Sequence, residues 1–198
     1  MASLSNLRLR LASEDDAESV LAIYGPVCES SASTFEFAPP SVEDVRERIR
    51  FVLTKWVWII AEQNEKVIGY AYGGEHRKRA AYQWSVELSI FLDSTSRNQG
   101  LGKTMIKALL EILKLQGYVT AFAGTTLPNA GSQGLVNKLG FEEIGVFRNI
   151  GYKFDTWHDV GWYQKQIQKP EANQSPPRPL SEVSPEAVNA ILASSIAD

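Results

Sequence analysis

At 198 residues, with 44% hydrophobic and 22% charged residues, the chain has the size and composition of one main globular domain with an appendage. Its formal net charge of -3 argues against a nucleic-acid-binding surface, which needs clustered basic side chains. The single cysteine, Cys28, excludes an internal disulfide framework and a cysteine-rich zinc site, so we expect no metal and a reducing, cytoplasmic location.

The first half of the chain predicts one strand, then two helices, and then a β-hairpin of two strands. Residues 7–11 alternate leucines with polar residues, which predicts a half-buried strand and not a signal peptide. Ser13 and Ser41 each precede an acidic residue by three positions and open a segment with helical apolar spacing, which predicts two capped helices. Residues 56–61 and 67–73 predict a β-hairpin. No apolar run approaches ~20 residues, so we expect no membrane span.

The second half begins with a basic loop, His76 to Arg79, that leads into a long predicted strand over 82–92. A glycine-containing loop then opens an amphipathic helix that begins at Leu101 and ends at Gly117. The remaining predicted elements are a strand over 118–123, a short helix over 129–139, and strands near 141–148 and 160–167.

The segment after Lys169 differs in composition from the rest. It is rich in proline and serine, so we expect residues 170–198 to form a tail that cannot bury enough surface to order itself, appended to a domain over 1–169. Within it, Ser184 and Pro185 precede apolar residues at helical spacing, which predicts one short capped helix that could dock on the body.

The loop Arg97-Asn98-Gln99-Gly100-Leu101-Gly102 is the most informative motif, because free backbone N–H groups at a helix start suit a pyrophosphate. A nucleotide-binding P-loop would need glycine at Arg97, and a dinucleotide fingerprint would need glycine at Met105. Two interpretations remain. One is R-x-x-G-x-G, the pyrophosphate loop of coenzyme-A-dependent N-acyltransferases, and the other is an ordinary strand–helix turn.

The predicted element order, β-α-α-β-β-β-α-β-α-β-β, resembles the GNAT acyltransferase superfamily. That resemblance implies an α/β (α+β) fold with a mixed, mostly antiparallel sheet flanked by helices. Over residues 7–167 the chain more closely resembles the phosphinothricin N-acetyltransferase family, which includes methionine sulfoximine and methionine sulfone acetyltransferases. The matching pieces are Ser33-Thr34-Phe35-Glu36, Gly69-Tyr70-Ala71-Tyr72, Arg79-Ala80-Ala81-Tyr82, Trp84-Ser85-Val86-Glu87, Leu139-Gly140-Phe141, Gly151-Tyr152-Lys153-Phe154 and Trp157-His158-Asp159-Val160.

The resemblance implies direct acetyl transfer from acetyl-CoA to the α-amine of a small amino acid, in a homodimer, while the net charge and the short apolar runs predict no nucleic-acid or membrane partner. Glu87 matches the family's glutamate and is the candidate general base, since an amino acid's amine is mostly protonated at neutral pH. By the two-residue period of a strand, Glu87 shares a face with Ser85 and Ser89. The structural alternative is a carboxylate that pairs with a basic loop residue or faces solvent.

The family also implies which residues bind the coenzyme. Asn129 could equally be only the N-cap of its helix, and Ser132 an ordinary first-turn residue. The implied coenzyme contacts are the main chain of Ser89, Ile90 and Phe91, the loop residues Arg97, Asn98, Gln99, Gly100, Leu101, Gly102 and Lys103, and the helix residues Asn129 and Ser132.

For the acceptor amino acid, an arginine fork could bind a carboxylate or phosphinate, although a solvated turn explains the same basic residues. The residues that the resemblance assigns to acceptor binding are Phe35, Glu36, Arg77, Lys78, Arg79, Tyr82, Lys153 and Trp157.

Two positions depart from the family pattern. Val136 stands where relatives commonly carry histidine or tyrosine, and valine cannot protonate a departing thiolate. Leu88 stands where many relatives have histidine. Two other functions therefore stay open: acetylation of peptide or protein N-termini, and a non-catalytic acyl-CoA-binding module.

Overall fold

A single seven-stranded sheet, ordered β1-β2-β3-β4-β5-β7-β6, organises the chain. The structure is a computed structural model and describes residues 6–196. The strands are β1 (Leu7–Leu11), β2 (Trp58–Gln63), β3 (Lys66–Glu75), β4 (Ser85–Leu92), β5 (Thr120–Leu127), β6 (Glu142–Lys153) and β7 (Thr156–Gln166). The helices are α1 (Ala17–Ser30), α2 (Val42–Leu53), α3 (Leu101–Gln116), α4 (Ala130–Lys138) and α5 (Pro185–Ser194). Only β4 and β5 pair in parallel, and every other neighbouring pair is antiparallel.

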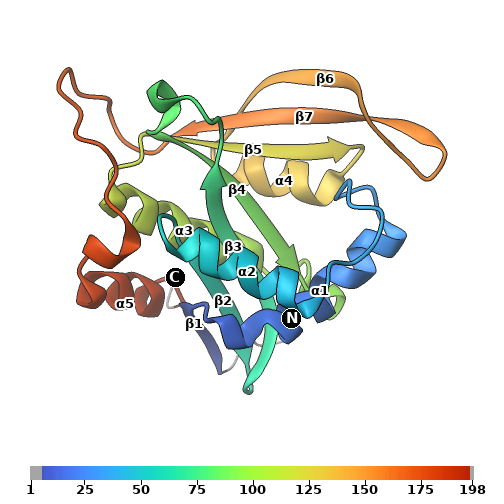
Figure 1. Cartoon of the computed structure of the whole chain (residues 1–198), viewed down its shortest axis with the longest axis horizontal. Helices are drawn as coiled ribbons and strands as arrows, with labels where there is room; N and C mark the ends of the chain where they lie inside the picture. The colour runs from blue at the N-terminus through green and yellow to red at the C-terminus, as the bar shows by residue number, and fades with distance from the viewer. Residues whose placement is uncertain (1–5, 197–198) are drawn as a thin grey trace.

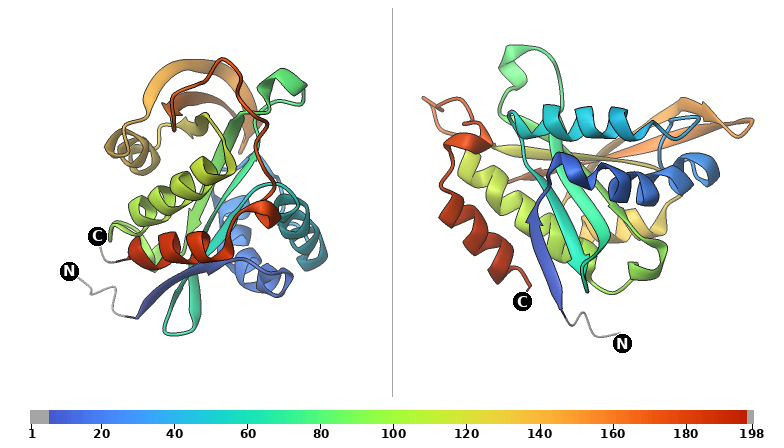
Figure 2. Two further views of the ribbon diagram at one scale, coloured as in Figure 1. Left: turned by 90° about the vertical axis from the view of Figure 1, so that its left-hand side faces the viewer. Right: turned by 60° about the horizontal axis from the view of Figure 1, so that its bottom comes forward.

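The helices cover both faces of this sheet. Figure 2 shows α1 and α2 on one face and α3 and α5 on the other, and the β6–β7 hairpin extends along one end of the molecule in Figure 1. The predicted fold class and element order are confirmed. The apolar stripe predicted for α3 is confirmed as well, because Leu101, Met105, Leu109, Ile112 and Leu113 are all fully buried.

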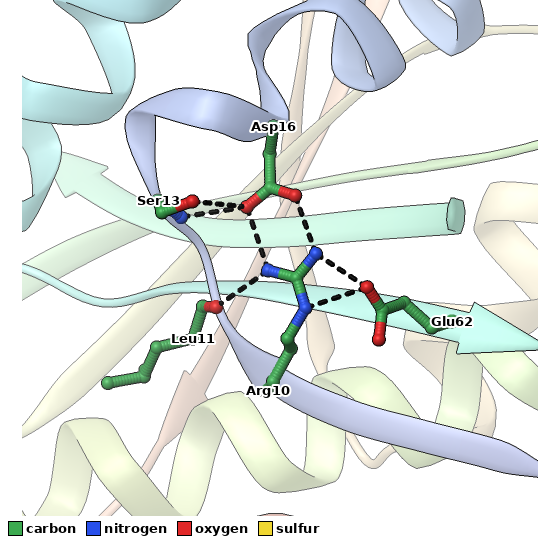
Figure 3. Close-up of polar contacts among 5 residues, drawn as sticks. All are labelled: Arg10, Leu11, Ser13, Asp16 and Glu62. Carbon is green, nitrogen blue, oxygen red and sulfur yellow. Dashed lines mark hydrogen bonds and ion pairs between the residues drawn. The ribbon is translucent and has the colours of Figure 1, made fainter. Parts of the chain in front are cut away.

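A charged cluster joins the first strand to its neighbours (Figure 3). The Arg10 guanidinium donates to both carboxylate oxygens of Asp16, at 2.8 and 2.6 Å, and to Glu62 Oε1 of β2 at 2.8 Å. Asp16 also accepts the backbone N–H of Ser13 at 2.7 Å, in the predicted capping box. The cluster therefore ties β1, β2 and the start of α1 together.

Several strand boundaries differ from the prediction. β4 begins at Ser85 and not near 82, because Ala80–Tyr82 forms a 3-10 turn closed by the Tyr82 N–H and the Arg79 carbonyl. β6 and β7 are longer than predicted and pair almost to their connecting turn. Their register shifts between Phe147 and Gly151, and this irregular stretch breaks the alternation by which a strand is recognised.

The expectation of a tail without order is wrong for most of residues 170–196. The predicted short helix exists as α5, and Val183, Val188 and Leu192 are buried against the body. The segment before α5 is hydrogen-bonded, from Trp84 Nε1 to the Ser175 carbonyl at 2.8 Å and between the Arg178 N–H and the Gln116 carbonyl at 2.7 Å. The proline-rich composition did not reveal these apolar contacts, which only the folded domain supplies.

Candidate active site

The site begins where β4 and β5 part. The two strands pair in parallel at only three positions, Ser85 with Thr120, Val86 with Ala121 and Glu87 with Phe122. Beyond Glu87, β4 continues to Leu92 against β3 alone, whereas β5 continues against β7. Figure 1 shows the two strands diverging. Within the described sheet, the second half of β4 therefore presents one edge of its backbone to no neighbouring strand.

Glu87 occupies the last paired position before the strands diverge. As predicted, it shares the partly exposed face of β4 with Ser85 and Ser89, while Val86 and Leu88 are buried on the other face. Partial burial raises the pKa of the Glu87 carboxyl to about 6, and the positive charge of Arg77 opposes this rise. At neutral pH the side chain is thus mostly a carboxylate, yet it binds a proton more readily than an exposed glutamate.

His76 is the neighbour of Glu87, which agrees with the structural alternative of a carboxylate that pairs with a basic loop residue. Its Nδ1 lies 3.4 Å from Glu87 Oε2. Its ring stacks on Phe122 of β5, with centroids 4.0 Å apart and planes 5° apart. The contact arises because β3 continues to Glu75 and pairs Gly74 with Glu87, which brings His76 beside the carboxylate. The predicted strand ended at Gly73 and left His76 in a loop.

The side chains of β4 beyond Glu87 pack on both faces of the sheet. Ile90 points toward α3, where it lies near Gly102. Phe91 makes an edge contact with Tyr24 of α1, with ring centroids 5.0 Å apart, and stacks on Tyr70. The side chains of Ile90 and Phe91 serve packing, so only their main chain remains for the coenzyme contact that the family implies.

The glycine loop turns the chain from β4 into α3. Gly100 has a left-handed φ of 88° at the N-cap, a conformation that favours glycine. A Cβ on Gly102 would lie 3.3 Å from a methyl group of Leu135, so this glycine lets α4 pack closely. The exposed Arg97 guanidinium contacts the Leu92 carbonyl at 3.3 Å. The start of α3 thus has the free N–H groups and the nearby positive charge that an anion needs.

Asn129 caps α4, as one of the two interpretations held. Its Oδ1 accepts the Ser132 N–H at 3.0 Å, and its Nδ2 lies 3.5 Å from Ser33 Oγ. These contacts account for the position of Asn129 by local structure alone. Coenzyme binding by Asn129 and Ser132 stays a prediction.

The assignment of Lys153 to acceptor binding is wrong. Its side chain is 2% exposed, and its Nζ donates to the carbonyls of Cys28, Ser31 and Thr34 at 2.7, 2.8 and 2.9 Å. An ammonium group has three hydrogens, so none remains for a substrate. A buried charge must be compensated, and here backbone carbonyls at the end of α1 do so.

Lys153 fixes the segment that carries Phe35 and Glu36. Phe35 lies directly over Gly151 of β6, where any Cβ would clash with its ring. Glu36 forms an ion pair with Arg48 of α2, at 2.7 Å and 3.2 Å, and accepts from Tyr24 Oη at 3.0 Å. Glu36 therefore has two protein partners before any acceptor arrives.

The remaining residues predicted to bind the acceptor lie at the surface. Arg77, Lys78, Arg79 and Tyr82 are exposed in the loop between β3 and β4. Arg77 is close enough to Glu87 for its charge to act on the carboxylate pKa. Trp157 of β7 is exposed beside Tyr152, with ring centroids 5.2 Å apart.

Comparison with known proteins shows which family has this sheet and these helices. A family model described as an acetyltransferase (GNAT) domain matches residues 9–162. The chain is 32% identical to a phosphinothricin N-acetyltransferase from Streptomyces viridochromogenes over 177 residues, which cover 89% of this chain and 94% of that protein. This chain belongs to the GNAT acetyltransferase family.

Further relatives of this acetyltransferase agree. It is 28% identical to an L-methionine sulfoximine/L-methionine sulfone acetyltransferase from Pseudomonas aeruginosa, over 80% of this chain and 94% of that one. The crystal structure of a phosphinothricin acetyltransferase from Sinorhizobium meliloti in complex with AcCoA matches it with a TM-score of 0.80 at 29% identity. That match covers 86% of this chain and 96% of the other. The predicted family and the predicted enzyme class, an acyltransferase, are confirmed.

Both departures from the family pattern lie in the core of this acetyltransferase. Leu88 and Val136 are buried, and each belongs to the main hydrophobic cluster. Val136 also uses its carbonyl to accept the Phe141 N–H at 3.0 Å. These two positions therefore serve packing, and the role of Glu87 as general base stays a prediction.

Proposed function

We propose that the protein transfers the acetyl group of acetyl-CoA directly to the α-amine of a small amino acid resembling phosphinothricin or methionine sulfoximine. The observation that carries the proposal is Glu87, a partly buried carboxylate at the point where β4 and β5 diverge. The similarity to named phosphinothricin and methionine sulfoximine acetyltransferases supports the class of acceptor.

The residues present fit coenzyme A. The start of α3, with Gly100 in a left-handed conformation, offers backbone N–H groups to a pyrophosphate, and Arg97 and Lys103 add positive charge. The free edge of β4 at Ser89–Phe91 offers main-chain groups to the pantetheine arm. When bound, the coenzyme supplies an acetyl thioester, and the solved relative in complex with AcCoA supports this assignment.

Glu87 performs the proton transfer in this proposal. The acceptor arrives mostly as an ammonium ion, which has no free electron pair with which to attack a carbonyl carbon. The carboxylate accepts one ammonium proton, directly or through a water, and the neutral amine then becomes the nucleophile. A pKa of about 6 makes Glu87 a stronger base than a solvated glutamate while it stays mostly unprotonated at neutral pH.

The acceptor lies, in this proposal, between the β3–β4 loop and the segment after α1. Arg77, Lys78 and Arg79 supply positive charge for the carboxylate and the phosphinate or sulfoximine group. Phe35, Glu36, Tyr82 and Trp157 complete the walls. The closeness of Arg77 to Glu87 supports this placement, because a carboxylate bound by Arg77 brings its own α-amine toward the base.

The decisive experiment incubates the purified protein with acetyl-CoA and follows thiol release. The acceptors are phosphinothricin, methionine sulfoximine, methionine sulfone and a short peptide with a free N-terminus. We expect turnover with the amino-acid analogues and little with the peptide. A preference for the peptide, or no turnover with any amine, would overturn the proposal.

Glu87→Gln should lower kcat/KM by roughly 10²–10⁴-fold, the usual contribution of a positioned base. Acetyl-CoA affinity, measured by calorimetry, should stay within about twofold, because the substitution keeps the shape of the side chain. In the unmodified enzyme, kcat/KM should rise with pH through a midpoint near the Glu87 pKa of about 6. Unchanged activity of the glutamine variant at pH 7 would remove Glu87 as the base.

We further infer a cytoplasmic homodimer that uses the β6–β7 hairpin. Exposed apolar side chains concentrate there, and surfaces of this kind mark protein interfaces. These residues are Ile144, Phe147, Ile150, Tyr152, Phe154 and Trp157, each 44–60% exposed. The buried free thiol of Cys28 is compatible with a reducing cytoplasm.

Light scattering after size exclusion tests the dimer. The unmodified protein should elute at twice the chain mass, and the double variant Ile150→Glu/Trp157→Glu should elute as a monomer. Phe37→Glu is the matched control, because Phe37 is 77% exposed but lies outside the hairpin. A monomeric unmodified protein at micromolar concentration would refute the inference.

A further inference from the structure

His76 is held rigidly by parts of three strands. It follows directly after the end of β3 at Glu75. Its ring lies flat on Phe122 of β5 and edge-on to Trp162 of β7, with centroids 4.0 Å and 6.0 Å away. Only 10% of its side chain is exposed. Such contacts on two sides leave the imidazole little freedom to rotate.

The fixed ring directs one nitrogen at Glu87. Nδ1 lies 3.4 Å from Glu87 Oε2, a long contact that a small movement of the carboxylate would shorten. Among residues 6–196, no other side chain forms a hydrogen bond or an ion pair with the Glu87 carboxylate. Since a carboxylate alone on a strand could adopt several rotamers, this contact selects one of them.

Burial and the charge of Arg77 favour the neutral form of the imidazole, whereas the nearby Glu87 carboxylate favours the charged form. Burial lowers the pKa of His76, and the adjacent charge of Arg77 lowers it further. The rings that face His76 from β5 and β7, those of Phe122 and Trp162, carry no charge. A neutral imidazole carries one N–H, which can reside on Nδ1 and be donated to the carboxylate.

We propose that His76 is a positioning residue for the acetyl-transfer reaction, whose Nδ1–H holds the Glu87 carboxylate in the orientation that accepts the proton of the acceptor amine. The inference rests on the role of Glu87 proposed above. In the proton transfer an N–H bond of the ammonium breaks and an O–H bond forms on Glu87, while the Nδ1 proton stays on His76.

A purely structural role for the ring makes a different prediction. If His76 only filled the space between Phe122 and Trp162, any flat ring of similar size would serve equally well. His76→Phe separates the two cases, because it keeps the aromatic stack and removes the nitrogen. His76→Asn is the complementary variant, since its side-chain amide can place an N–H near the position of Nδ1 while the stack is lost.

The experiment uses the full-length protein and records kcat/KM for phosphinothricin against pH. His76→Phe should lower kcat about 3- to 10-fold and move the acidic midpoint up by about 0.5–1 pH unit, because the carboxylate loses a donor. His76→Asn should restore part of that shift. His158→Phe, the same change at the chain's other histidine, should leave the midpoint in place.

Two readouts separate a failure of this inference from a failure of the proposed function. Carbon NMR titration of the Glu87 carboxyl needs no turnover, and its pKa of about 6 should rise in His76→Phe. In a Glu87→Gln background, His76→Phe should have no further effect on kcat, because His76 acts only through Glu87. An unchanged NMR midpoint, or an equal loss in both backgrounds, would overturn the role of His76. A fully active Glu87→Gln would remove Glu87 as the base, and with it the role assigned to His76, whereas an absence of turnover with every amine would overturn the proposed function itself.

Discussion

Glu87 and Lys153 are both charged residues in strands, and the protein satisfies their hydrogen-bonding groups to different extents. Lys153 is enclosed by three backbone carbonyls that satisfy its ammonium group completely. Glu87 keeps access to solvent and has one long contact, to His76. A residue whose hydrogen-bonding capacity is filled by the protein stabilises the fold, whereas one that is left partly unfilled can exchange a proton with a substrate.

Asp16 shows the effect of full pairing on stability. Burial alone would raise the pKa of its carboxyl, but the hydrogen bonds from Arg10 and Ser13 outweigh burial and lower the pKa below its usual value. A carboxyl whose pKa is lower in the folded state stabilises the protein above the unfolded-state pKa. That stability is lost as the pH falls through the folded-state pKa.

Asp16→Asn should therefore lower the free energy of unfolding at pH 7 by about 1–3 kcal/mol, since it leaves Arg10 with an uncharged partner. Urea denaturation at several pH values measures the effect. The difference between the two proteins should shrink as the pH falls below 4. Asp15→Asn, an exposed neighbouring carboxylate, is the control and should change stability by less than about 0.5 kcal/mol. Equal stability of both variants at pH 7 would contradict the assignment.

At the scale of elements, the β6–β7 hairpin and the segment after α1 act as one unit. Lys153 joins the end of β6 to backbone carbonyls of residues 28–34 through hydrogen bonds. The lack of a side chain at Gly151 leaves room for the ring of Phe35. The segment that would contact the acceptor amino acid is therefore positioned by a strand more than a hundred residues later in the chain.

Lys153→Met should release this segment, because it leaves three buried carbonyls without their donor. We expect a loss of about 2–4 kcal/mol in unfolding free energy and a several-fold rise in KM for the acceptor. The affinity for acetyl-CoA should change little, since the proposed pyrophosphate site is at the start of α3, which is not part of the hairpin or of the segment after α1. Lys107→Met, at an exposed position of α3, serves as the control. An equal rise of the acceptor KM in the control, or an unchanged acceptor KM in Lys153→Met, would show that the segment does not contribute to acceptor binding.

At the scale of the whole molecule, both ends of the described chain meet on one side of the sheet. α5 packs on β1, the edge strand, and on α3. Edge strands expose unpaired backbone and are often covered by another element. Within the part of the chain that the structure describes, no helix is long and apolar enough to cross a membrane.

Removal of residues 170–198 should expose the surfaces that Val183, Val188 and Leu192 now cover. Each buried side chain of this kind contributes about 1.5–3 kcal/mol, so the melting temperature should fall by roughly 10–35 °C. Leu192→Ala should give a smaller fall of the same sign, and Asn189→Ala, at an exposed position of α5, should give almost none. A truncated protein with the same melting temperature as the full chain would show that α5 does not stabilise the fold.

The sequence by itself determined the order of the elements and the face of the sheet on which Glu87 lies. Apolar spacing predicted α3 and its buried stripe, Ser13 and Ser41 predicted their capping boxes, and the motif around Glu87 pointed to its strand and face. These features depend on neighbours a few positions away, so a local pattern records them.

Only the tertiary structure decided which polar side chains have partners. Lys153 meets the carbonyl of Ser31, 122 residues away, and Trp84 meets that of Ser175, 91 residues away. His76 reaches Glu87 because β3 continues two residues beyond its apolar pattern. Such contacts follow from strand register and from the divergence of β4 and β5, which depend on the packing of the whole chain and leave no periodic signal in the sequence.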